Sequence, residues 1–116
     1  MKKAKINPKK RIAVPVHYTP IERVIWERIH QRRRQVLIHS VLYYRLDKSI
    51  IEDQLFDKWA YELVQLQKDY PKISESVPYH LDAFRAFDAT TCFDLPISDS
   101  YALQIATFIH KLSDSK

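Results

Sequence analysis

Two adjacent tyrosines and two carboxylates near the middle of the chain could together bind a ligand. Tyr43 and Tyr44 end one helical pattern, and Asp53 and Asp57 open the next after a short connection. The two aspartates are four residues apart, so they share one face of a helix. Aromatic rings stack on flat cationic rings, and carboxylates accept hydrogen bonds from carboxamides. With Phe56 as a further ring, these residues predict a pocket for a flat, hydrogen-bonding ligand, including a cationic one.

The same residues also have a purely structural explanation. Tyr43 and Phe56 would then belong to the core, Asp57 would be solvated, and Asp53 would cap a helix. Asp53 suits a helix N-terminus because the helix dipole favours negative charge there. Residue types alone leave both explanations open.

The first of these helices has a clear start signal. Thr19 is a suitable N-cap, Pro20 suits the first helical position, and Glu22 completes a capping box. A helix is therefore predicted over residues 20–45. Its predicted apolar face at helical spacing comprises Ile21, Ile25, Ile29, Val36 and Tyr43.

A second helix is predicted over residues 53–70, with Asp53 as its cap and Pro71 as a stop signal. Because the connection is short, the two helices should pair as an antiparallel hairpin. The apolar stripe predicted for the second helix comprises Phe56, Trp59, Leu63 and Leu66.

Two shorter helices are expected later in the chain, within residues 77–88 and from Ser98 or Asp99 to about residue 112. The apolar residues expected on the last helix are Tyr101, Ile105, Phe108 and Ile109. The prediction is an all-α fold, with an extended basic arm over residues 1–18 and one helical domain over residues 19–116.

Composition excludes several classes of protein. The 116 residues contain no glycine, which rules out Rossmann and P-loop phosphate fingerprints and disfavours tight β-hairpins. Cys92 is the only cysteine, so no internal disulfide or cysteine-based zinc site is expected, and a reduced, cytoplasmic setting is favoured. Apolar runs are too short for a membrane span. No metal site is expected.

Positive charge is concentrated at one end of the chain. Residues 1–35 carry eleven Lys and Arg against two Glu, whereas residues 36–116 carry eight basic and twelve acidic residues. A basic end of this kind binds nucleic acid or an acidic protein, or it is simply a solvated tail. The candidate nucleic-acid-binding residues are Lys9, Lys10, Arg11, Arg32, Arg33 and Arg34.

Two polar residues fall on the apolar face predicted for the first helix. Arg32 is either a side chain that extends along the surface, a sign of a break in the helix, or a pocket-facing guanidinium that holds an anion. His39, one turn before Tyr43, is expected as a hydrogen-bonded histidine at the edge of the core.

Three segments resemble the N-terminal nicotinamide-mononucleotide-binding domain of NAD-dependent DNA ligases. In that family a helix ends in a YYVLD-like run, a D-x-x-Y-D motif opens the next helix, and an E-L-x-x-L-E-x-x-(H/Y)-P run closes it. Here the chain reads YYRLD at 43–47, DQLFD at 53–57 and ELVQLQKDYP at 62–71. The resemblance implies a helical hairpin that binds NAD or nicotinamide mononucleotide (NMN). The pocket residues that it implies are Tyr43, Asp53, Phe56 and Asp57, with Tyr44 where the family has His or Tyr.

The chain departs from the family pattern at several points. Phe56 replaces the motif tyrosine and loses its hydroxyl, while Arg32 and Arg45 stand where the family usually has apolar residues. The K-x-D-G motif that carries adenylate in ligases is absent, and no glycine exists to form it. Ligation by these residues alone is therefore not expected.

The expected function is that of a non-catalytic binding or regulatory protein, of a kind encoded by phages or mobile elements. It would bind NAD or NMN, or engage a host protein such as the host ligase, for example as an inhibitor. The alternative is a small nucleic-acid-binding protein that uses the basic arm. A third hypothesis is an NAD- or NMN-processing enzyme with Asp53 or Asp57 as general base, although no second catalytic group is evident.

Overall fold

A computed structural model describes residues 13–90 and 94–114. These residues form helices and connections, with no strand in the described ranges, which confirms the all-α prediction. Much of the predicted basic arm, including Lys9, Lys10 and Arg11, lies outside the described residues. The helices are α1 (Pro20–Arg45), α2 (Asp53–Asp69), α3 (Pro71–Glu75), α4 (Leu81–Arg85) and α5 (Ser100–Asp114).

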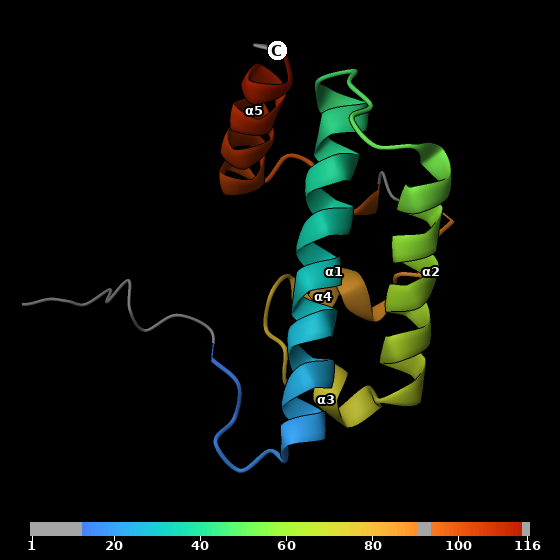
Figure 1. The fold of residues 1–116 in the computed structure, drawn as a ribbon, viewed down its shortest axis with the longest axis vertical. Coiled ribbons are helices and arrows are strands. Elements are labelled where there is room, and N and C mark those ends of the chain that lie inside the picture. The colour runs from blue at the N-terminus through green and yellow to red at the C-terminus, as the bar shows by residue number, and fades with distance from the viewer. Residues whose placement is uncertain (1–12, 91–93, 115–116) are drawn as a thin grey trace, which may run out of the picture.

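Helix α1 is the central element of the molecule. Helix α2 runs antiparallel along one side of it and α5 packs on another side, while α3 and α4 follow α2 in the chain (Figure 1). The predicted hairpin is therefore confirmed. No helix of the described residues is long and apolar enough to cross a membrane.

The start of α1 follows the sequence signals. Thr19 Oγ1 accepts from the Glu22 backbone N–H at 3.2 Å, and Glu22 Oε1 accepts from the Thr19 N–H at 2.8 Å. This capping box satisfies two N–H groups that lack partners within the helix. The helix spans the residues predicted for it.

The buried face of α1 agrees with the predicted one only in part. Ile29 and Val36 are fully buried and Ile25 packs against the core. Ile21 and Tyr43 are 73% and 57% exposed, because the buried face lies further around the helix. Helices α2, α3 and α5 pack on α1, so a broad surface is buried. This surface includes a charged residue that an apolar pattern does not identify. The buried residues are Trp26, Ile29, Arg33, Val36, Leu37, Ile38, Ser40, Val41 and Leu42.

Helix α2 starts differently from the prediction. Glu52 occupies the N-cap position without a side-chain hydrogen bond, and Asp53 is the first helical residue. The prediction that Asp53 caps the helix is therefore wrong. Pro71 does follow the end of α2, and it also opens α3.

Helix α5 is capped as expected by Asp99, whose Oδ2 accepts from the Ala102 N–H at 2.9 Å. Its buried residues are Ala102 and Ala106, small side chains that let two helices approach closely. Tyr101 and Phe108, which the sequence assigned to the apolar face, are 66% and 62% exposed. The assignment is therefore wrong for these two residues, whereas Ile105 and Ile109 do pack, partly buried, against the core.

Candidate ligand-binding cavity

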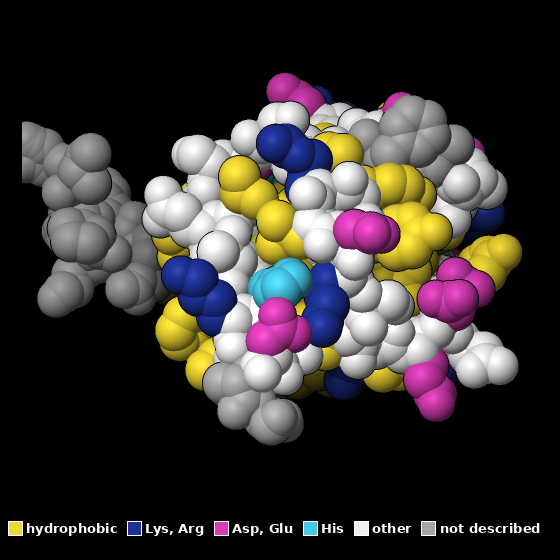
Figure 2. Space-filling model, turned by 90° about the horizontal axis from the view of Figure 1, so that it is seen from above, with side chains coloured by type: hydrophobic (Ala, Val, Ile, Leu, Met, Phe, Trp, Pro, Cys, Tyr) yellow, Lys and Arg dark blue, Asp and Glu magenta, His cyan; other side chains and the backbone are white. Residues whose placement is uncertain are grey.

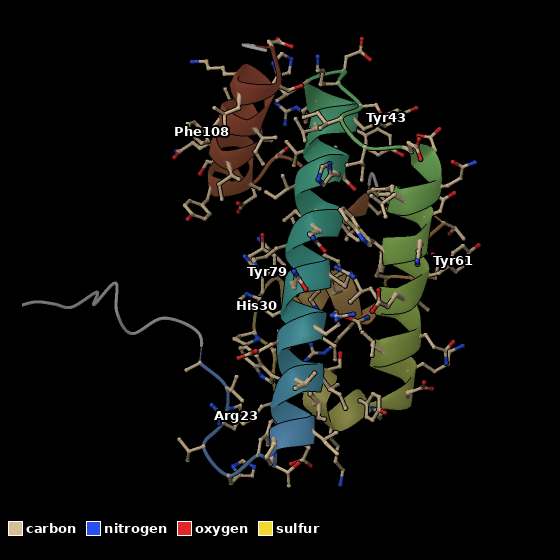
Figure 3. The ribbon with its side chains drawn as sticks, in the orientation of Figure 1. Arg23, His30, Tyr43, Tyr61, Tyr79 and Phe108 are labelled. Carbon is tan, nitrogen blue, oxygen red and sulfur yellow. The ribbon has the colours of Figure 1, made fainter. Side chains whose placement is uncertain are left out.

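A cavity of about 300 Å³ lies at the connected end of the α1–α2 hairpin. Tyr43 lies there, at the end of α1 (Figure 3). All five residues proposed from the sequence as ligand-binding line this one cavity, namely Tyr43, Tyr44, Asp53, Phe56 and Asp57. The other lining residues are His39, Ser40, Lys48, Ser49, Ile50, Ile51, Ala89 and Thr90.

Aromatic side chains form one part of the cavity wall. The rings of Tyr43 and Tyr44 meet edge to face, with centroids 4.8 Å apart. The ring centroids of His39 and Trp59 are 5.6 Å apart. Burial lowers the pKa of His39. The imidazole is therefore neutral at neutral pH. The wall offers uncharged rings on which a flat ligand can stack.

Carboxylates form another part of the wall. Asp53 and Asp57 are exposed residues one turn apart at the start of α2. Within the described ranges neither side chain forms an ion pair or a hydrogen bond. Both are therefore open to a cation or an amide donor.

Ser40 contributes a polar atom at the base of the cavity. The residue is 1% exposed, and its Oγ has no hydrogen-bond partner among the described residues. A buried hydroxyl without a partner is unfavourable unless a ligand or water bonds to it. No pattern in the sequence identified this residue, because a serine within a helix is usually unremarkable.

A segment beyond the hairpin contributes Ala89 and Thr90 to the cavity. Ala89 has a left-handed backbone with φ of 73°. Asp88 Oδ1 accepts from the backbone N–H and from the hydroxyl of Thr90, at 3.0 and 2.6 Å. These bonds lower the pKa of the Asp88 carboxyl, so it stays charged. No local pattern predicted this wall, because it forms only through tertiary contact.

Lys48 is the cationic lining residue that the sequence did not identify. Asp47, with φ of 51°, turns the chain out of α1, and the Lys48 N–H then donates to the Leu42 carbonyl at 2.9 Å. The Lys48 ammonium lies 2.8 Å from Asp114 Oδ1 of α5.

The three consecutive arginines proposed for nucleic-acid binding have three different environments. Arg33 is fully buried, so the proposal that it contacts phosphate is wrong. Arg32 lies outside the cavity, with Nε 2.8 Å from Glu62 Oε1 and its guanidinium 5.4 Å from the centroid of the Trp59 ring. The helix is continuous there, so Arg32 marks no break. Arg34 is exposed.

The buried Arg33 joins three parts of the fold. Its five N–H groups bond to Gln67 Oε1 at 2.8 Å, to the Val77 and Tyr79 carbonyls at 2.7 and 3.3 Å, and to the Ser74 carbonyl and hydroxyl at 3.0 and 2.9 Å. Burial lowers its pKa to about 10, which still leaves it charged at neutral pH. Because every donor has a partner, this residue is structural.

Arg45 also lies outside the cavity lining. Its Nη1 donates to Ser98 Oγ at 3.0 Å. The bond ties the end of α1 to the turn that precedes α5. This departure from the family pattern therefore serves the attachment of α5.

This helical hairpin, with aromatic and acidic side chains at its connected end, is related to a known class of domain. Residues 22–76 match the family described as DNA ligase-like, N-terminal NAD+-binding domain. Among curated proteins, the DNA ligase of Pseudothermotoga lettingae is 37% identical over 49 residues. That alignment covers 42% of this chain and 7% of the ligase. No solved structure gives a significant match. Helices α4 and α5 lie outside the matched residues.

Proposed function

We propose that the cavity binds the NMN part of NAD, and that the protein acts as a non-catalytic binding or regulatory module. The observation that carries this proposal is the convergence of Tyr43, Tyr44, Asp53, Phe56 and Asp57 on one cavity. Its volume of about 300 Å³ is at the lower end of the range for small-molecule sites.

The chemistry of the wall suits a nicotinamide ring. Its positive charge is balanced by Asp53 and Asp57, and its flat face stacks on Tyr43 or Phe56. The carboxamide NH₂ donates to a carboxylate, and its oxygen accepts a hydrogen bond from the Ser40 hydroxyl. The otherwise unpartnered Ser40 Oγ thereby gains a partner.

The proposal of a non-catalytic role rests on what the 116 residues contain. Without glycine they cannot form the K-x-D-G motif that carries adenylate in ligases. A regulatory or inhibitory function would act through a cytoplasmic protein partner. The ligase of a host cell is the partner expected of a phage- or mobile-element-encoded module.

A heteronuclear NMR titration of the whole chain tests the binding proposal. NMN and NAD should shift the amide signals of residues 39–57 and 88–90, because these segments line the cavity. AMP, which lacks nicotinamide, is the matched control and should leave them in place. Equal shifts with AMP, or no shift with NMN at millimolar concentration, would remove the cavity as a nicotinamide site.

A second candidate function is nucleic-acid binding, and one observation favours it. Arg23 and Arg34 are exposed and line a shallow hollow on α1 together with Ala13 and Val14. The six basic residues of the arm lie within residues 2–11, shortly before Ala13 in the sequence. Figure 3 shows Arg23 on the side of α1 where residues 13–18 lie. The hollow and the arm could together follow a phosphate backbone.

Binding to duplex and single-stranded DNA at several salt concentrations tests this candidate. Affinity should fall steeply with salt, because phosphate contacts release counterions. Arg34→Glu should weaken binding, whereas Lys72→Glu on the exposed surface of α3 should weaken it less. Deleting residues 1–11 should abolish it. No binding at low salt would eliminate the candidate.

A further inference from the structure

Lys48 adds a positively charged side chain to the lining of the candidate cavity. It is the one Lys or Arg among the lining residues in the described part of the chain. Its ammonium is 2.8 Å from Asp114 Oδ1, and its side chain is 31% exposed. The cavity therefore has carboxylates from the start of α2 and a cation from the link that precedes it.

The partner of Lys48 comes from a different part of the fold. Asp114 is the last residue of α5, a helix outside the family match. The hydrogen bond from Lys48 lowers the pKa of the Asp114 carboxyl, and His110 Nδ1 lies 3.2 Å from its second oxygen. Seen from above this end of the molecule, a histidine side chain lies beside acidic and basic ones, among hydrophobic patches (Figure 2).

The charge layout of the cavity matches a ligand with two unlike ends. Asp53 and Asp57 would attract a cationic ring, whereas Lys48 would attract an anionic group. The ammonium, however, is already paired with Asp114. An anionic ligand group must therefore share or displace an existing partner.

We propose that Lys48 binds the phosphate of a nicotinamide nucleotide and that Asp114 competes with this phosphate, so that α5 sets the preference for phosphorylated ligands. The proposal rests on the proposed function of the cavity. It assigns a regulatory role to α5. The family match ends at residue 76, before this helix begins.

Two substitutions that break the same ion pair should have opposite effects. Lys48→Met removes the phosphate partner and keeps much of the side-chain length, so it should weaken NMN binding. Asp114→Asn removes the competing charge and its repulsion of phosphate, so it should strengthen NMN binding. If the ion pair had a purely structural role, both substitutions would change the NMN affinity in the same direction.

Isothermal titration calorimetry of the full chain with NMN and with nicotinamide riboside, which lacks the phosphate, tests the proposal. The ratio of the two affinities should fall about tenfold in Lys48→Met, the value of a charge-assisted contact of ~1.4 kcal/mol. The ratio should rise a few-fold in Asp114→Asn. Lys58→Met, on the exposed surface of α2, should leave the ratio unchanged.

The outcomes separate this proposal from the one on which it rests. If the riboside binds but the ratio is the same in Lys48→Met as in the unaltered protein, the phosphate assignment is wrong and the nicotinamide site stands. Equal shifts of the ratio in both variants would also overturn the competition. If neither ligand binds the unaltered protein, both proposals fall.

Discussion

Two polar regions of α1 differ in whether the protein satisfies its own hydrogen-bonding groups. Around Arg33, each of five N–H donors has an acceptor within the chain. Seven residues later, Ser40 is equally buried and its hydroxyl has no partner among the described residues.

The same contrast holds for the charges near each site. The Arg33 guanidinium is enclosed, with the Phe84 ring 5.5 Å from it. Asp53 and Asp57 face a cavity and pair with no cation of the described residues. A buried polar group that is fully bonded indicates a structural role, whereas the buried, unpartnered hydroxyl of Ser40 supports the proposed ligand site. The family match adds to this inference, because it covers both regions.

The largest expected effect is on stability and concerns the fully hydrogen-bonded Arg33. Arg33→Met should lower the free energy of unfolding by about 3–5 kcal/mol, because it leaves the carbonyls of Ser74 and Val77 buried without donors. Urea denaturation followed by circular dichroism measures this. Arg34→Met, at the exposed neighbour, should change it by less than about 0.5 kcal/mol.

The contrast between Arg33 and Ser40 also predicts how Arg33→Met affects ligand binding. NMN affinity, measured on molecules that remain folded, should be unchanged, since no cavity residue is altered. A loss of stability below about 1 kcal/mol would show that the network is less important than its geometry indicates.

The next largest effect concerns a carboxylate of the cavity. Asp57→Ala should weaken NMN binding by about 1.5–3 kcal/mol, the range for hydrogen bonds to charged groups. Asp69→Ala, near the other end of the same helix, is the control and should leave the affinity unchanged. Unchanged affinity in Asp57→Ala, measured by calorimetry, would remove this residue from the site.

A smaller effect, with opposite signs for stability and binding, is expected at Ser40. Ser40→Ala should raise the free energy of unfolding by up to about 1 kcal/mol, because it removes a buried hydroxyl without a partner. The same change should weaken NMN binding by about 1 kcal/mol. If stability falls instead, Oγ has a partner such as a bound water, and the contrast with Arg33 disappears.

The smallest effect concerns pH. Burial lowers the pKa of His39, so the folded protein resists protonation that the unfolded chain accepts. Stability should therefore be complete above about pH 6.5 and should decline as pH falls below that value. His30, whose pKa is lowered by burial and by Arg34 and Arg33, should contribute in the same direction.

Ligand binding isolates the contribution of His39. Protonation of His39 would repel a nicotinamide ring, so riboside affinity should fall a few-fold between about pH 7 and pH 5. The riboside avoids the titration of a phosphate. His39→Gln should flatten this dependence, whereas His17→Gln, at an exposed position, should preserve it. A profile that is the same in both variants would exclude His39 as its cause.

Local signals in the sequence predicted the helices well. The Thr19 capping box and the Asp99 cap place the starts of α1 and α5, because each depends on residues three positions apart. The spacing of Tyr43 to Asp57 around a short link also predicted which side chains gather at the end of the hairpin. These features depend on chain geometry over a few turns.

Features that depend on tertiary contact were not predictable in the same way. The buried face of α1 was predicted only in part, because three helices pack on it and because it includes a charged residue, Arg33. Ser40, Lys48 and Ala89 were missed as cavity residues, since each becomes distinctive only through what lies opposite it. The spacing of apolar residues cannot identify a buried polar residue when hydrogen bonds to distant parts of the sequence are what stabilise it in the core.

The left-handed backbone of Ala89 has a consequence for the mechanics of the cavity. In a chain without glycine, an alanine holds φ of 73°, a conformation that costs an L-residue about 1–2 kcal/mol. The bonds between Asp88 and Thr90 hold it in place. This part of the cavity wall therefore carries backbone strain. The parts formed by α1 and α2 contain no residue with a positive φ.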